Sequence, residues 1–100
     1  MTASLADSES VRLDDDGNWQ PRSRDATTEL RILLPEMSTR LGGPITRVSL
    51  NIDAWDGDQP RRMRVDDRVV RLGWFHTMDP ATVTIARGSG PRVTLHVVQP

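Results

Sequence analysis

Residues 61–72 read RRMRVDDRVVRL, a run in which apolar and charged side chains alternate on both sides of two aspartates. This alternation is typical of a half-buried β-hairpin, because successive side chains of a strand point to opposite faces. With the two aspartates as a two-residue turn, Arg62 pairs with Arg71 across the hairpin. One face then carries Met63, Val65, Val70 and Leu72, and the other carries Arg62, Arg64, Val69 and Arg71.

The polar face of this hairpin therefore crowds three arginine side chains. Like charges placed opposite one another in a sheet destabilise it by several tenths of a kcal/mol, so the face needs acidic neighbours, a bound anion or open water. The preceding loop contains Asp53, Asp56 and Asp58, which would neutralise the arginines in an internal ion-pair network. The sequence leaves open whether the arginines are neutralised in this way or are free to bind an anion, because the two alternatives differ only in geometry.

The leading hypothesis is a non-catalytic binding module that uses this polar sheet face. Its candidate binding residues are Arg62, Arg64 and Arg71, with Arg47 and Trp55 nearby. The expected partner is an acidic protein surface or nucleic acid, and the first is favoured because the net charge is only −1. Self-association through an exposed edge strand is an equally simple use of the same surface.

Composition limits the remaining possibilities. One hundred residues are enough for one domain, which we place at residues 11–100 after a small, polar and flexible arm at 1–10. The absence of cysteine excludes disulfides, thiol nucleophiles and thiolate metal sites. The spacing of His and Asp fits no metal site, and no cofactor motif is present. We expect no membrane span and a cytoplasmic protein.

One helix is predicted to begin near Asp25, with Asp25 or Ser23 as its N-cap. Pro35 lies inside it, yet the apolar spacing continues beyond this residue, which favours one kinked helix over two. The Gly-Gly-Pro sequence at residues 42–44 is a typical helix end. The buried stripe consists of Ala26, Leu30, Leu33, Leu34, Met37 and Leu41.

The other regular segments read as strands. Alternation over residues 45–52 predicts a central strand, and residues 82–87 and 92–98 predict a final hairpin around a glycine-rich loop. A short edge hairpin is expected around the turn at residues 16–17. The predicted fold is α+β: an antiparallel sheet of about five to seven strands, open or partly barrelled, packed on one amphipathic helix.

Enzymatic activity is the alternative hypothesis. His76 lies in a loop after the arginine hairpin, and a His76–Asp79 pair would supply a general base and its orienting group. This hypothesis of a small hydrolase or isomerase predicts a pocket lined by Trp74 and Phe75. Three residues of loop fix no geometry between the pair, so the sequence makes a non-enzymatic role the preferred reading.

Four segments together resemble a family of small actinobacterial proteins classed as a domain of unknown function. They are residues 16–25 (DGNWQPRSRD), 51–55 (NIDAW), 71–75 (RLGWF) and 79–84 (DPATVT). The resemblance covers most of the chain and implies a bacterial intracellular setting, with no activity attached. Glycine is usual at the second hairpin-turn position of such proteins, where this chain has Asp67.

Overall fold

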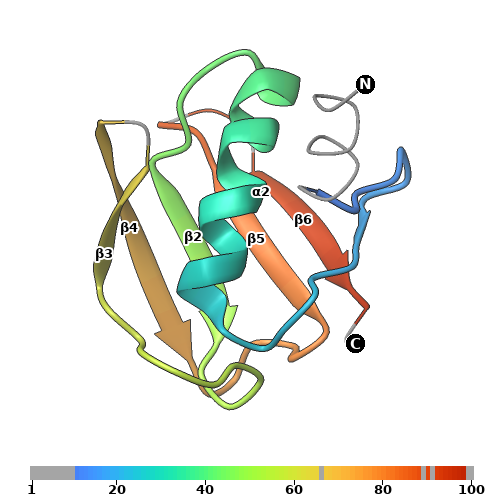
Figure 1. The fold of residues 1–100 in the computed structure, drawn as a ribbon, viewed down its shortest axis with the longest axis vertical. Helices are drawn as coiled ribbons and strands as arrows, with labels where there is room; N and C mark the ends of the chain where they lie inside the picture. Colours follow the sequence, from blue (N-terminus) through green and yellow to red (C-terminus); the bar gives the residue numbers. More distant parts are fainter. Residues whose placement is uncertain (1–10, 66, 89, 91, 99–100) are drawn as a thin grey trace.

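The computed structural model describes residues 11–65, 67–88, 90 and 92–98. One helix packs on one side of a six-stranded sheet, which stays open and does not close into a barrel (Figure 1). The predicted arm at residues 1–10 lies outside the described residues. The elements are β1 (Asn18–Trp19), α2 (Ala26–Leu41), β2 (Arg47–Asn51), β3 (Arg62–Val65), β4 (Arg68–Phe75), β5 (Thr82–Ala86) and β6 (Arg92–Val97).

The structure confirms both the register of the predicted arginine hairpin and the sheet face on which each of its side chains lies. Arg62 pairs with Arg71 and Val65 pairs with Arg68, so β3 and β4 are antiparallel as expected. The four apolar side chains of the hairpin are buried, whereas the three arginines and Val69 are exposed. Asp67 adopts the left-handed conformation that the short turn requires, with φ at 66°.

The predicted α+β fold, with one helix on a sheet of five to seven strands, is confirmed, but the sheet is mixed and not antiparallel throughout. The strand order is β1-β6-β5-β2-β4-β3, in which β2 runs parallel to β4 and β1 runs parallel to β6. After β2 the chain crosses to the sheet edge to form β3 and then returns as β4 between β3 and β2. This return gives β4 the direction of β2, an outcome that alternation within each strand does not encode.

Helix α2 follows the prediction closely. Asp25 is its N-cap and accepts a hydrogen bond from the backbone N–H of Thr28, and Gly42 ends the helix with φ at 75°. The helix runs through Pro35 without interruption. Every residue of the predicted apolar stripe is buried except Leu41, which is half-buried. The 3.6-residue period therefore identified the face that packs on the sheet.

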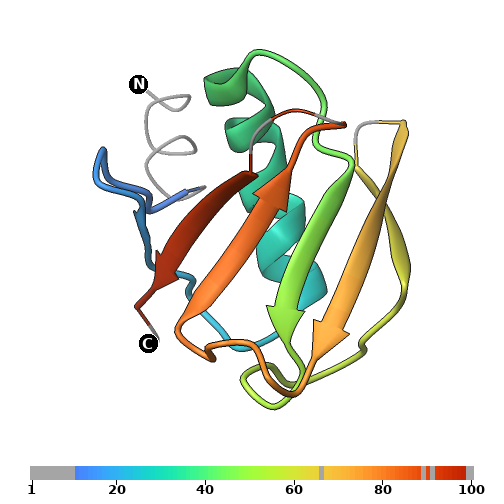
Figure 2. The ribbon, with the colours of Figure 1, turned by 180° about the vertical axis from the view of Figure 1, so that it is seen from behind.

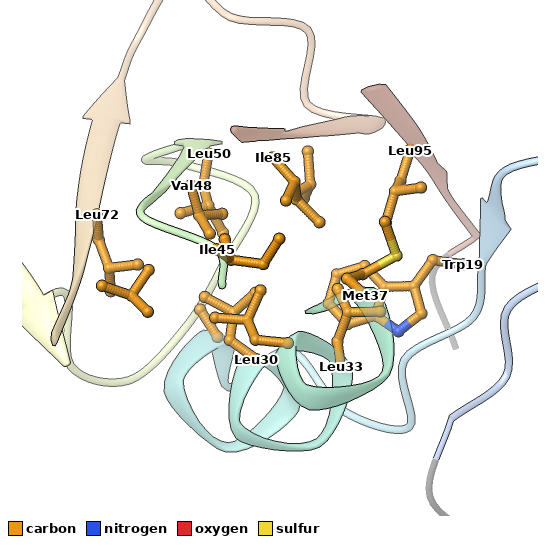
Figure 3. Close-up of a cluster of buried hydrophobic side chains, with 14 of the residues drawn as sticks. Trp19, Leu30, Leu33, Met37, Ile45, Val48, Leu50, Leu72, Ile85 and Leu95 are labelled. Carbon is orange, nitrogen blue, oxygen red and sulfur yellow. The ribbon is translucent and has the colours of Figure 1, made fainter. Parts of the chain in front are cut away.

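The core lies between this helix and one face of the sheet. Figure 3 shows Leu30, Leu33 and Met37 of α2 turned toward side chains of the central strands and of β6. Val48, Leu50, Val83 and Ile85 are fully buried there. At one end of the core the rings of Trp19 and Trp55 stack, with centroids 5.6 Å apart. No helix of the described residues covers the opposite sheet face (Figure 2).

The loop between β2 and β3 folds against the start of the helix. The backbone N–H of Asp56 donates to the carbonyl of Arg24 at 2.7 Å, which ties the loop to the segment preceding α2. Asn51 accepts hydrogen bonds from the next turn of the loop, and the Trp74 indole N–H donates to the carbonyl of Pro60 at 2.8 Å. These hydrogen bonds tie the loop to the segment before the helix and to the ends of β2 and β4.

Candidate functional site

Four arginines form a row across the open face of the sheet. The strand registers place Arg62 opposite Arg71, Arg71 beside Arg47, Arg47 opposite Ala86, and Ala86 opposite Arg92. This arginine row, defined as Arg47, Arg62, Arg71 and Arg92, crosses β3, β4, β2 and β6, with the small Ala86 on β5. All four side chains are exposed. Neighbouring strands lie about 4.8 Å apart, so the row extends about 19 Å across the sheet.

The charge on this face is uncompensated within the sheet. Strands β2 to β6 contain six arginines and no Asp or Glu. No member of the arginine row forms an ion pair with a described carboxylate. The net charge of −1 therefore conceals a separation of charge, in which the carboxylates of the described residues lie on the helix, in the turns and in the loops.

The predicted internal ion-pair network is not formed among the described residues. Asp53 lies 3.4 Å from the His76 ring, and Asp56 pairs with Arg24 at 3.6 Å. Asp58 borders a hollow that it shares with Arg62, but forms no ion pair there. The carboxylates of the loop thus leave the arginine row without its expected counter-charge.

The arginine row is the border between two shallow hollows of the open face. The first, of about 920 Å³, extends from the row toward the end of β4 and is lined by Phe75, Ser49 and Thr84 as well as by the row. The second, of about 800 Å³, lies on the other side and reaches Val69 and Gly88. A ligand that lies along the row therefore has room on both sides of it.

Phe75 supplies an exposed aromatic ring beside the row. It lies on the same face of β4 as Arg71 and Gly73, and 48% of its surface is exposed. Its ring folds back over Gly73: a Cβ at residue 73 would lie 2.8 Å from Cε2 of Phe75. Because residue 73 has no side chain, the ring can occupy the space above it, one side-chain row from the arginines.

Trp55 is not part of this face, contrary to the prediction. It is 3% exposed and stacks on Trp19 in the hydrophobic core. The physical reason is the docking of the loop between β2 and β3 against the helix start, which carries Trp55 to the helix side of the sheet. Arg64 does lie on the exposed face of edge strand β3, but outside the arginine row.

Comparison with known proteins gives the family. The model of a family of unknown function, DUF5994, matches residues 3–100. The chain belongs to the DUF5994 family. Its classification as a domain of unknown function agrees with the resemblance noted in the sequence, and it attaches no activity to the open face. No curated protein and no solved structure matches the chain.

In this DUF5994 chain, the residues of the enzymatic hypothesis are arranged differently from the prediction. Asp79 accepts a hydrogen bond from the backbone N–H of Ala81, which fixes a turn, and Asp53 is the carboxylate nearest to His76. The side chains of His76 and Asp53 are 74% and 76% exposed. Trp74 and Phe75 line the hollow beside the arginines and not the one that contains His76. No described hydroxyl group hydrogen-bonds to His76.

Within residues 11–65, 67–88, 90 and 92–98, no cluster of three or more His, Asp or Glu side chains is arranged to hold a metal ion. In the same part of the chain, no helix combines the length and the apolar character needed to cross a membrane.

Sequence reasoning missed Arg92 and Phe75 as members of the face. The signals were present, because Arg92 alternates with Thr94 and His96 on the polar side of the last strand, and Phe75 has the same parity as Arg71. What was missing was the strand order. Only the placement of β5 and β2 between β6 and β4 brings Arg92 into line with Arg71.

Proposed function

We propose that this protein is a non-catalytic binding module whose open sheet face receives an anionic partner. The observation that carries the proposal is the arginine row, which crosses five paired strands without a compensating carboxylate in any of them. Guanidinium groups bind phosphate and carboxylate oxygens in a bidentate manner, so an acidic protein surface and nucleic acid both fit this face.

The repulsion between neighbouring arginines of the row supports a binding role. Arg71 stands between Arg62 and Arg47 on neighbouring strands, an arrangement that costs several tenths of a kcal/mol for each like-charged pair. An anion along the row removes this repulsion and adds charge-assisted hydrogen bonds. Binding is therefore favoured by both terms, and it is weakened by salt, because the arginines are exposed to the solvent.

The test is an amide NMR titration of the isotope-labelled protein with two polyanions, a deca-glutamate peptide and a dT decamer. We expect at least one of them to shift the amides around Arg47, Arg71 and Arg92, with smaller shifts at higher salt. The double variant Arg62→Gln/Arg71→Gln should lose this binding. The matched control Arg12→Gln/Arg40→Gln changes the net charge equally at exposed sites that border neither hollow of the open face, and it should bind as the wild type does.

Two results would overturn the proposal. One is a spectrum that neither polyanion changes at low salt. The other is a set of shifts centred away from the open face and unaffected by the Arg62→Gln/Arg71→Gln substitutions. Thermal melting of both double variants shows that they remain folded, which the exposure of the substituted side chains leads us to expect.

A further inference from the structure

The open face presents cationic side chains next to an aromatic ring, and an acidic peptide has no need of both. The arginine row offers cationic groups along a line across the strands, and Phe75 offers a flat, half-exposed ring beside that line. Carboxylate side chains require only the first. A nucleic acid strand requires both, because it carries phosphates along its backbone and a flat base on each nucleotide.

From this combination we infer that the anionic partner is single-stranded nucleic acid, with its phosphates along the arginine row and a base stacked on Phe75. The inference rests on the proposed function and specifies the partner of the same face. The separation of charge removes the earlier reason for preferring an acidic protein, because the net charge of −1 does not describe a face whose strands contain no carboxylate.

The spacing within the face supports this arrangement. Side chains on one face of a strand repeat about every 7 Å, so the position of Gly73 is about 7 Å from that of Arg71. The Phe75 ring lies over Gly73, which places it in the side-chain row next to the arginines. This separation is comparable to that between the base and the phosphate of one nucleotide. A phosphate at Arg71 therefore brings its base within reach of the ring.

The surroundings of the ring suit an unpaired base. Ser49 and Thr84 line the same hollow of about 920 Å³ and supply hydroxyl groups that donate and accept hydrogen bonds. The hollow lies on the sheet face that the described helix does not cover (Figure 2). A duplex would keep its bases stacked inside the double helix, away from Phe75. The geometry therefore favours a single strand over a duplex.

The test measures fluorescence anisotropy with four labelled probes: a dT decamer, the same decamer with abasic sites throughout, a dT·dA decamer duplex and a deca-glutamate peptide. For the wild type we expect the dT decamer to bind most tightly. Phe75→Leu keeps an apolar side chain but removes the ring, and it should weaken dT binding by roughly five- to 150-fold. Binding of the abasic decamer should not change, and Phe75→Trp should retain dT binding.

The salt dependence of binding tests the proposed contacts between the arginine row and the phosphates. If the four arginines contact four phosphates, the logarithm of the dT affinity should fall with the logarithm of the salt concentration with a slope of about −3. Arg71→Gln should reduce the magnitude of this slope by about 0.7, whereas the control Arg12→Gln, at an exposed position before β1, should leave it unchanged.

The outcomes separate this inference from the proposed function. Equal binding of deca-glutamate and the dT decamer, with no effect of Phe75→Leu, would overturn the nucleic acid inference and leave the anionic-partner proposal intact. Equal weakening of dT and abasic binding by Phe75→Leu, or tightest binding of the duplex, would also overturn the single-strand inference. If none of the four probes binds at low salt, both proposals are wrong.

Discussion

At the residue scale, Asp25 links the start of the helix to pH. Its carboxylate accepts hydrogen bonds from the backbone N–H of Thr28 and from the Thr27 hydroxyl, and these hold its pKa below the ordinary value. A carboxyl group with a lowered pKa stabilises the fold at pH values above its unfolded pKa of about 3.9. That contribution is lost as the pH falls through the folded pKa.

We therefore predict that Asp25→Asn reduces the loss of folding stability that occurs as the pH is lowered. Asparagine keeps the capping oxygen but does not titrate, so the variant should melt below the wild type at pH 5 and approach it at pH 2. Melting temperatures measured by circular dichroism across this range check the prediction. A difference between the two proteins that stays constant with pH would contradict it.

Asp67 affects the stability of the fold through its backbone conformation. Its φ of 66° is a conformation that glycine adopts without strain and that costs other residues roughly 1 kcal/mol. Asp67→Gly should therefore raise the free energy of unfolding by about 0.5–1 kcal/mol, measured by urea denaturation. Asp67→Asn is the control that removes the charge alone, and an equal gain in this variant would assign the effect to charge.

At the scale of elements, Glu29 fastens the segment before the helix to its first turns. Its side chain is 5% exposed and accepts hydrogen bonds from the backbone N–H of Arg22 at 3.0 Å and from the Ser23 hydroxyl at 2.7 Å. The helix start, and with it the loop that pairs with Arg24, is positioned by this carboxylate.

Glu29→Ala should consequently lower the free energy of unfolding by about 2 kcal/mol or more, because it leaves two donors without their acceptor. Glu29→Gln retains one acceptor oxygen and should cost less. Glu36→Ala, which removes a partly exposed ion pair with Arg40 on the same helix, should cost no more than about 0.5 kcal/mol. Urea denaturation compares the three variants, and equal losses in Glu29→Ala and Glu36→Ala would refute the role of Glu29.

At the scale of the whole molecule, the separation of charge predicts how salt affects stability. Repulsion along the arginine row destabilises the unliganded protein, and salt screens it. The melting temperature of the wild type should therefore rise with salt. Arg71→Gln should melt at the same temperature or a few degrees higher at low salt, and should gain less from added salt.

Arg24→Gln is the matched control for this prediction. Arg24 pairs with Asp56 at 3.6 Å, so its loss removes an attraction and should lower the melting temperature slightly. A fall in melting temperature for Arg71→Gln as well would show that Arg71 has a stabilising partner, as the internal ion-pair network supposed.

The sequence by itself determined the parts of this protein that depend on local periodicity and turn chemistry. The two-residue period fixed the register of the arginine hairpin and the face of each of its side chains. The 3.6-residue period, with Asp25 and Gly42 at the ends, fixed the helix and its buried stripe. These features follow from contacts between residues close in the chain, so a single sequence is enough to find them.

The tertiary structure alone decided what those elements face. Strand order placed Arg47 beside Arg71 and brought Arg92 into the same row, while loop docking moved Trp55 into the core and set Asp53 beside His76. Such pairings join residues far apart in the chain through loops without a periodic pattern. They are selected by the burial of the whole apolar face at once, which no local stretch of sequence specifies.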